Sequence, residues 1–485
     1  MKKLKHPILF AFLAICLNSC DNVVDLNEDT KAYTNPVPEA LMSSSQEQYA
    51  IFLNNASANR NNFRLYSQQW TAVAYPDESR YDMVARNLGN ANWQLLYRDV
   101  LKDLVDAKNR IAASDAAGTE AIAIRKNKVA IVEIQIVQVF QTLVDLYGNV
   151  PYSEALDAKN FQPKYDDGLT IYKDLAKRLP EAISQLDPAY DSFGDADLIF
   201  GGDVASWKKY ANSIQIRLGM QLSDVDATLA KSLVETAYAS GAIASNADNA
   251  IFEYTSASPH FNPNYLDFKS RADFSISKTF ADALNALNDP RRDFYFDPAS
   301  KKGGVYVGAT YGEKADLSTV SLYNPILKEI NYKGDLFDYA ETSFLLADAA
   351  NRGFSVGGSA ATHYTNGITA SMQFWGVPSG DIATYLAQPS VAFATATGSN
   401  AKERIAYQMW IAYYNRGFEA WTAYRRLDFP VLVAPAAAVP AADKKVPVRM
   451  IYSHLAPSTN GANYAAASTA IGGDKMTTKL FWDKF

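Results

Sequence analysis

The chain has 485 residues, of which 48% are hydrophobic and 20% are charged, as in an ordinary globular protein and unlike a disordered one. At about 150 residues a domain, this length predicts three units, although repeat arrays depart from that rule. The 46 Lys and Arg against 52 Asp and Glu give a formal net charge of −6. That balance argues against a protein that binds nucleic acid by neutralising phosphates.

The N-terminus carries an export signal. Three lysines among the first five residues precede an unbroken apolar run over residues 8–17, which is shorter than the ~20 residues that a membrane-spanning helix needs. Leu17-Asn18-Ser19-Cys20 ends the run, and a Cys at the cleavage point resembles the lipobox of a bacterial lipoprotein. We therefore expect a signal peptide over residues 1–19 and a lipid on Cys20, with an ordinary signal and a chance Cys as the alternative.

The cysteine count agrees with this interpretation. Cys16 and Cys20 are the two cysteines, so the exported chain holds no internal disulfide. Loss of residues 1–19 leaves 43 basic against 52 acidic residues and a charge of −9. Such an acidic protein is not expected to bind anionic lipid by charge, so the acyl chains on Cys20 must anchor it to the membrane.

Beyond a polar, acidic tether over residues 20–35, we expect a single α-helical domain over residues 36–485. Apolar residues recur every three or four positions from Val129 to Tyr147, which predicts a helix with one buried face. Glu and Gln residues interrupt the run, so it is not membrane-spanning. The β-branched alternation from 132 to 137 leaves a strand as an alternative.

A pair of helices is predicted more clearly over 340–351 and 361–375, joined by a short Gly-rich turn. Further helical stretches are expected at 93–113, 168–187, 204–222, 228–240 and 402–427. The fold class is therefore mainly α, with paired helices that suggest degenerate tetratricopeptide-like units. The strict repeat pattern is absent, so a plain helical bundle stays open.

Long irregular stretches separate these helices, at 245–335, 376–400 and 430–475. Loops of this length are usually functional or disordered, and the aromatics within 261–311 favour ordered, functional loops. The Pro/Ala tract 434–442 is interpreted as an inert insertion.

Motifs for catalysis are weak. Gly353-Phe-Ser-Val-Gly357 matches a nucleophile elbow, but a helix precedes it where that motif needs a strand, so it is interpreted as a turn. The histidines have no zinc spacing, and no phosphate-binding or dinucleotide motif is present. The acidic cluster 191–203 lacks calcium-loop spacing. We expect no enzyme, cofactor or metal, although 52 acidic residues leave a hidden hydrolase possible.

Aromatic residues in polar loops are the remaining signal. Sugar rings pack their C–H faces on aromatic planes, and their hydroxyls need polar partners. The candidate ligand-binding residues stack through an aromatic ring or hydrogen-bond through a guanidinium: Tyr75, Arg80, Tyr81, Phe268, Arg271, Tyr306 and Tyr311. Any one of these aromatics is more often a core residue, but as a group in loops they favour a binding surface.

Several motifs, in order along nearly the whole chain, resemble those of the SusD-like (SusD/RagB) nutrient-binding outer-membrane lipoproteins. They are Tyr147-Gly-Asn-Val-Pro-Tyr-Ser-Glu-Ala155, Gly202 to Ser213 with Arg217-Leu218, Asp289-Pro290-Arg291, Tyr339-Ala340-Glu341 with Gly367 to Met372, Gln408 to Arg426 with Pro430, and Leu480-Phe481-Trp482-Asp483. Phe481 departs from the family's terminal W-W-D, which puts only local packing in doubt.

The resemblance implies a helical fold built on about four tetratricopeptide-like pairs, with a loop-rich side that faces the ligand. It implies an outer-membrane location through lipid on Cys20, on the extracellular face, and a SusC-like TonB-dependent β-barrel transporter as partner. Motif residues such as Asp203, Trp207 and Asn212 are then structural, and no ligand contact transfers by motif. The ligand is expected to be an oligosaccharide. A peptide ligand, gripped by Arg80 and Arg271, and a scaffold that binds only proteins are the alternatives.

Overall fold

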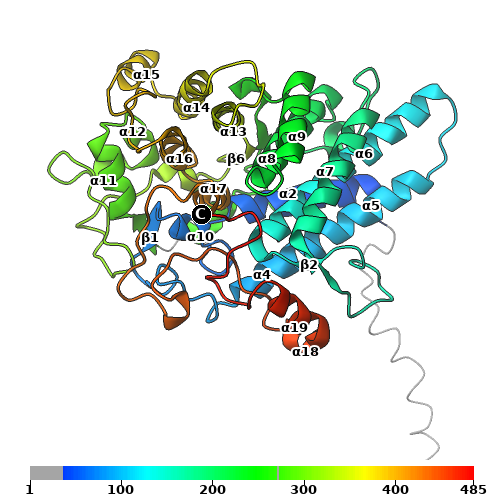
Figure 1. Ribbon diagram of the computed structural model, residues 1–485, viewed down its shortest axis with the longest axis horizontal. Coiled ribbons are helices and arrows are strands. Elements are labelled where there is room, and N and C mark those ends of the chain that lie inside the picture. The colour runs from blue at the N-terminus through cyan, green and yellow to red at the C-terminus, as the bar shows by residue number, and fades with distance from the viewer. Residues whose placement is uncertain (1–35, 270–271) are drawn as a thin grey trace, which may run out of the picture. The chain divides into compact units, whose positions relative to one another are not determined.

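Helices make up most of the structure, a computed structural model that describes residues 36–269 and 272–485 (Figure 1). Pro38–Phe485 forms one compact unit. The predicted signal peptide, the tether and Cys20 lie outside the described residues. The helices are α2 (Pro38–Asn54), α3 (Phe63–Tyr66), α4 (Leu88–Gln94), α5 (Lys102–Ala113), α6 (Thr119–Tyr147), α7 (Gly168–Gln185), α8 (Val204–Leu222), α9 (Ala227–Ser240), α10 (Pro263–Phe268), α11 (Lys278–Ala286), α12 (Arg292–Tyr295), α13 (Tyr339–Asn351), α14 (Ala360–Phe374), α15 (Ser379–Leu386), α16 (Ala401–Ala412), α17 (Gly417–Leu427), α18 (Ala456–Thr459) and α19 (Gly461–Ala470).

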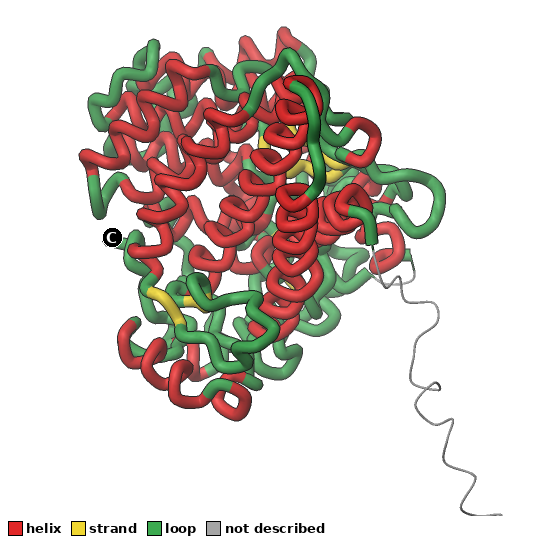
Figure 2. Tube along the Cα trace, turned by 90° about the vertical axis from the view of Figure 1, so that its right-hand side faces the viewer, coloured by secondary structure: helices red, strands yellow, loops and turns green. Residues whose placement is uncertain are grey.

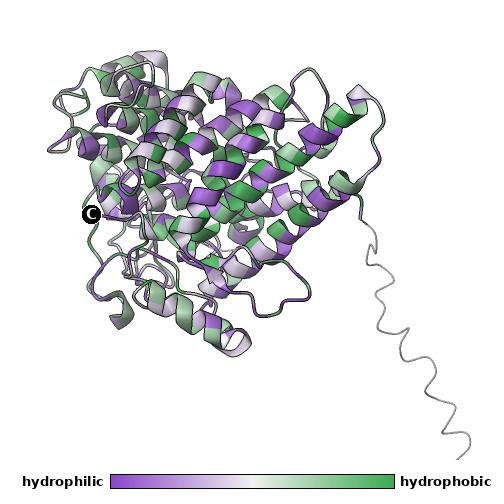
Figure 3. Cartoon of the chain, turned by 45° about the vertical axis from the view of Figure 1, so that its right-hand side comes forward, coloured by the Kyte–Doolittle hydropathy of each residue, from purple (hydrophilic) through white to green (hydrophobic). Residues whose placement is uncertain are grey.

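Short polar side chains start many of these helices. The Asp203 carboxylate accepts hydrogen bonds from the amides of Ala205 and Ser206, and Ser359 accepts one from Thr362, at the starts of α8 and α14. Hydrophobic and hydrophilic stretches alternate along the helices (Figure 3), as burial of one face requires. The helix predicted over 402–427 is two helices, because the chain turns at residues 413–416, where Asn415 adopts a φ of 68°.

The helices pack as consecutive pairs, α6 with α7, α8 with α9, α13 with α14, and α16 with α17. Each pair also contacts the next, through α7 with α8, α8 with α13, and α13 with α16. Figure 2 shows these helices filling most of the view, with loops gathered around them. This serial stacking confirms the mainly α, tetratricopeptide-like fold and distinguishes it from a plain bundle.

Helix α6 is a largely buried helix in the first pair of this array. It is the one helix, among residues 36–269 and 272–485, long and apolar enough to cross a membrane, but 89% of its apolar window is buried inside the protein. Buried residues occur on every side of its second half. The strand considered over 132–137 is therefore wrong, because packing on all sides lets β-branched residues sit in a helix.

The strands form three antiparallel pairs that join distant parts of the chain. β1 (Trp70–Ala72) pairs with β5 (Phe274–Ile276), β2 (Val150–Pro151) with β3 (Tyr165–Asp166), and β4 (Ala250–Phe252) with β6 (Gly334–Phe337). In the first pair, Trp70 lies opposite Ile276. The segment predicted as loops over 261–311 also contains α10, α11 and α12, so it is more regular than expected.

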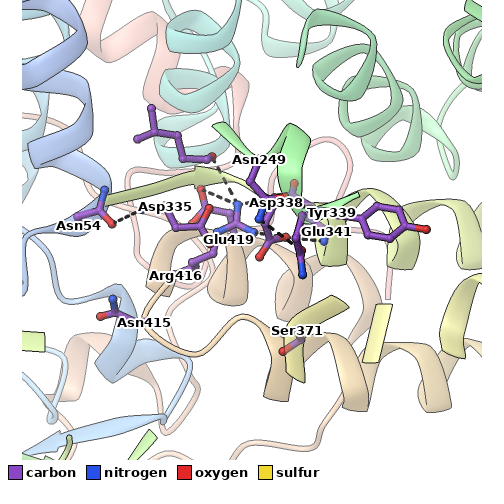
Figure 4. A network of polar contacts seen from close by, with 12 residues as sticks. Asn54, Asn249, Asp335, Asp338, Tyr339, Glu341, Ser371, Asn415, Arg416 and Glu419 are labelled. Atoms are coloured by element: carbon purple, nitrogen blue, oxygen red, sulfur yellow. Dashed lines mark hydrogen bonds and ion pairs between the residues drawn. The ribbon is translucent and has the colours of Figure 1, made fainter. Parts of the chain in front are cut away.

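A buried ion-pair network links α8, α13 and α17, and Figure 4 shows the part of it around Arg416. The Glu341 carboxylate accepts hydrogen bonds from Arg217 at 2.5 and 2.9 Å and from Arg416 at 2.5 Å. Burial opposes ionisation of Glu341, but the two guanidinium groups hold its pKa below its ordinary value. Burial, with Asp338 close by, raises the pKa of Asp335 well above its ordinary value despite Arg416.

Candidate functional site

Three loop segments meet on one side of the protein, and we call this surface the three-loop face: residues 73–87, 301–323 and 428–445. Arg80 joins all three, because its Nε donates to the Gly312 carbonyl at 2.9 Å and its own carbonyl accepts from the Val439 amide at 2.9 Å. Gln68, just before β1, donates to the Val433 carbonyl at 2.7 Å. The loop-rich side expected from the sequence is therefore an ordered surface.

A groove of about 380 Å³, here the loop groove, opens on this face. Its size falls within the range of small-molecule sites, about 300–1,000 Å³. Polar side chains and exposed apolar ones line it together: Gln68, Lys278, Thr279, Asp282, Thr310, Tyr311, Glu313, Val431, Val433, Pro435 and Ala436. Such a mixture offers hydrogen bonds to hydroxyls and apolar contact to C–H faces.

Two of the predicted residues lie at the surface here. Tyr75 is 53% exposed, and its loop is hydrogen-bonded to the 301–323 loop, which supplies part of the groove lining, since the Val73 carbonyl accepts from the Ala315 amide. Arg80 is partly exposed, and its Nη1 lies 3.9 Å from the Asp77 carboxylate. The structure therefore brings Tyr75 and Arg80 together on one loop at the three-loop face.

Tyr81 and Tyr311 lie beneath that surface. Their ring centroids are 6.1 Å apart, and the Tyr311 hydroxyl donates to the Leu65 carbonyl at 2.6 Å. Burial raises the pKa of Tyr81 to about 12, although the Gln68 side chain bonds to its hydroxyl. The prediction that these two rings are exposed for stacking is wrong, although an edge of Tyr311 reaches the loop groove.

Phe268 and Tyr306 are also buried, contrary to the prediction. Phe268 packs 5.3 Å from the ring of Tyr323, which itself stacks on Trp70 at 4.6 Å. The Tyr306 hydroxyl donates to Asp293 at 2.5 Å. A long segment with few helices needs buried side chains of its own, and these aromatics supply them. Arg271 lies outside the described residues.

The sequence analysis missed two parts of the loop-groove lining. Lys278 and Asp282 lie on α11, a helix that was not predicted, and they form an ion pair with each other. Val431 and Val433 are exposed on either side of buried Leu432. Their burial alternates although all three residues are apolar, so the sequence gives no signal for it.

The Pro/Ala tract over 434–442 is not the inert insertion that its composition suggested. Pro435 and Ala436 line the loop groove, and Ala442 is fully buried. The Gly312 Cα also lies so close to Pro435 that a side chain there would collide with the proline ring.

The motif residues behind the family resemblance are structural. Trp207 donates to Asp197 at 2.6 Å, and Asn212 donates to the Gly241 carbonyl at 2.8 Å. Arg291 pairs with Asp289 at 2.6 Å, and both side chains are fully buried. As the resemblance implied, these polar groups fasten helices together instead of facing a ligand.

The weaker chemical motifs also have structural roles. Gly353 has a φ of 81° in the turn between α13 and α14, so Gly353 to Gly357 is the predicted helix-pair turn. Asp197 of the acidic cluster is buried and also accepts from the Gln46 side chain at 2.8 Å. Within residues 36–269 and 272–485, no three His, Cys, Asp or Glu side chains lie close enough together to hold a metal ion.

Comparison with known families gives a match over residues 30–453 to the SusD-like family, described as starch-binding and associating with the outer membrane. The chain belongs to the SusD-like family. No protein in the curated set compared with this chain matches it.

Solved structures agree with this family assignment. A structure named as a chitin-binding protein is 27% identical, with a TM-score of 0.80 over 92% of this chain and 100% of its own. A chitin-binding SusD homologue from Flavobacterium johnsoniae is 21% identical, with a TM-score of 0.75, and the match covers 92% of this chain and 97% of that homologue. A SusD-like protein from Bacteroides thetaiotaomicron is 22% identical, with a TM-score of 0.78, and the match covers 92% of this chain and 98% of that protein. The last two show the shared fold.

Proposed function

We propose that this SusD-like protein is a lipoprotein of the cell surface that binds oligosaccharide and delivers it to a SusC-like TonB-dependent transporter. The observation that carries the proposal is the family match over residues 30–453, joined to an ordered, hollowed loop face on the helical scaffold. Starch in the family description and chitin in two structural relatives both name glycans. In this proposal the protein is a binding component and not an enzyme.

Within the three-loop face, the loop groove with Tyr75 and Arg80 beside it is the site we propose for the glycan. Tyr75 supplies the exposed ring, and the Arg80 guanidinium supplies donors beside the groove. Because the groove is open to solvent, we expect modest affinity, since binding must offset the ligand's lost freedom and the dehydration of its hydroxyls.

Calorimetric titration tests the proposal. The mature lipoprotein, held in a detergent without a sugar headgroup, is titrated with chitin oligomers, with starch oligomers and with a protein digest. We expect heat with one of the glycans, and an affinity about three- to tenfold lower for Tyr75→Ala or Arg80→Ala. Val84→Ala, an exposed position on the same loop, is the matched control and is expected to bind like the wild type.

The alternatives give different results. Heat with the digest alone, reduced by added salt, would indicate a peptide whose carboxylates meet Arg80, because salt screens exposed charges. If none of the three ligands gives a heat of binding, the result would favour a scaffold that binds only proteins.

The lipid anchor is tested separately. We propose that acyl chains on Cys20 hold the protein at the outer membrane, facing outward. Cys20→Ala in the full chain is expected to move the protein from the membrane fraction to the soluble fraction. Retention of this variant in the membrane would contradict the anchor. Surface labelling of intact cells reports the outward face, and capture of a β-barrel transporter with the protein reports the partner.

A further inference from the structure

A second groove, here the aromatic groove, shares no lining residue with the loop groove. Its volume is about 310 Å³. α4, β2 and α18 lie side by side around it, at the lower right of Figure 1. Its lining residues are Asn90, Trp93, Gln94, Tyr97, Pro151, Ala155, Leu156, Phe161, Pro163, Tyr165, Ser453, Leu455, Ala456, Thr459 and Asn460.

Aromatic rings form the floor and one lip of this groove. Trp93 lies 4.9 Å from Tyr97 and 5.8 Å from Tyr165, measured between ring centroids, and all three rings are partly exposed. Phe161, on the loop between β2 and β3, is 84% exposed, so water surrounds a large apolar ring at the rim. A single exposed apolar residue is ordinary on a protein surface, but Phe161 lies at the rim of a groove that three other aromatic rings also line.

The loop that carries Phe161 is held in place. The Asn460 side chain donates to the Pro163 carbonyl at 2.7 Å, and Asn463 donates to the Gln162 carbonyl at 2.9 Å. The Tyr97 hydroxyl donates to the Pro151 carbonyl at 2.6 Å, across the groove floor. Because these hydrogen bonds hold both walls in place, the aromatic groove is preformed, and ligand binding loses little conformational entropy of the protein.

Two side-chain amides with no partner among the described residues line the same space. The Gln94 side chain makes no hydrogen bond within the described part of the chain. The Asn90 Oδ1 accepts from Ser453 at 2.6 Å, which leaves the Asn90 Nδ2 with no acceptor among the residues described. Trp93 and Gln94 end α4 where it passes into a π-helical segment, Leu95–Leu101, a rare geometry that is frequent at functional sites.

The lining carries no Asp, Glu, Lys, Arg or His. A charged peptide or a phosphate would find no counter-charge there, and a purely apolar segment would leave the amides unsatisfied. A neutral ring with C–H faces and many hydroxyl or acetamido groups satisfies both the aromatics and the amides.

We propose that the aromatic groove is a second carbohydrate-binding site, which takes neutral sugar rings of the same glycan or of the polymer from which it comes. This inference rests on the proposed glycan-binding function. The groove holds a short stretch of chain, with Phe161 packed on one ring and Gln94 and Asn90 bonded to its polar groups.

Two surface variants test it without risk to the core. Phe161→Ala and Gln94→Ala, made in the mature full-length lipoprotein, are titrated with chitin and starch oligomers of increasing length. We expect affinity for the preferred oligomer to fall about three- to tenfold in Phe161→Ala and to return in Phe161→Tyr. Ile122→Ala, at an exposed position on α6 outside both grooves and the three-loop face, is the control and is expected to bind like the wild type.

A fluorescence measurement reports the groove directly. Of the seven tryptophans, Trp93 and Trp375 are partly exposed and the other five are buried. The oligomer is expected to protect tryptophan emission from quenching by acrylamide. That protection should persist in Trp375→Phe and disappear in Trp93→Phe.

The outcomes separate this inference from the function on which it rests. If a glycan binds but both variants keep wild-type affinity and tryptophan stays unprotected, the aromatic groove is not a sugar site, and the proposed function stands. If no glycan binds the native protein, the function and this inference both fail. If Phe161→Ala releases a protein partner while glycan affinity is unchanged, the groove is a protein contact and the inference is overturned.

Discussion

Replacement of Arg291 by Met is expected to destabilise the fold strongly. Arg291 and Asp289 are both fully buried, with 2.6 Å between Nη2 and Oδ2. The same guanidinium donates to Gln408 on α16 at 3.0 Å and to Ser371 on α14 at 3.2 Å. Arg291→Met therefore leaves a buried carboxylate uncompensated and removes the link between two helices. Loss of one partner of a buried pair costs about 3–5 kcal/mol of unfolding free energy.

Guanidinium unfolding, followed by circular dichroism, measures this loss. Lys278→Met is the matched control, because Lys278 and Asp282 form an ion pair that is largely exposed, and such pairs contribute at most about 1 kcal/mol. We also expect the double variant Asp289→Asn, Arg291→Met to lose less than the sum of the single variants, since no unpaired charge remains. A loss in Arg291→Met no larger than that of Lys278→Met would refute the reasoning.

Two further predictions concern pH and close packing. Burial raises the pKa of Asp145 from 3.8 to about 6, while Tyr172 donates to its carboxylate at 2.5 Å. The folded state thus holds a proton that the unfolded chain releases, and this contribution to stability falls as pH rises from about 4 to about 6. Asp145→Asn should therefore stabilise the protein at pH 7, by at most about 3 kcal/mol, and less at pH 4, and an equal gain at both pH values would contradict this. A Cβ on Gly308 would lie 2.3 Å from the Ser277 carbonyl oxygen, so Gly308→Ala should lower the thermal midpoint, whereas Gly380→Ala, with no atom within 4 Å, should not.

Helices were the features that the sequence predicted best. The stretch expected over 204–222 is α8 to the residue, and the pair expected over 340–351 and 361–375 is α13 and α14 within one residue. These helices have a regular apolar period and local start signals, which depend only on neighbours in the chain. The sequence analysis did not predict α11, because its nine residues lie within a segment rich in Asn, Asp and Pro. A helix this short covers too few turns for an apolar period to be recognised.

The candidate site was less predictable, for a physical reason. Tyr75 and Tyr81 lie six residues apart in one aromatic and polar segment, yet the first is half exposed and the second is fully buried. The exposed and the buried residues of a loop have the same amino-acid composition, so composition does not tell them apart. Only contacts with residues far along the chain decide which ring is buried. Tyr81 is covered by Tyr311, which is 230 positions away.

The sequence by itself therefore determined the helical class and the order of motifs that marks a SusD-like chain, and it predicts an export signal with a lipid on Cys20. Periodicity, an N-terminal apolar run and short motifs are local properties, so they are visible without the fold. Tertiary structure alone decided which aromatics remain open, because a groove is made by chain segments that are distant in sequence. Trp93, Phe161 and Asn460 meet in the aromatic groove only because α4, the β2–β3 loop and α18 pack together.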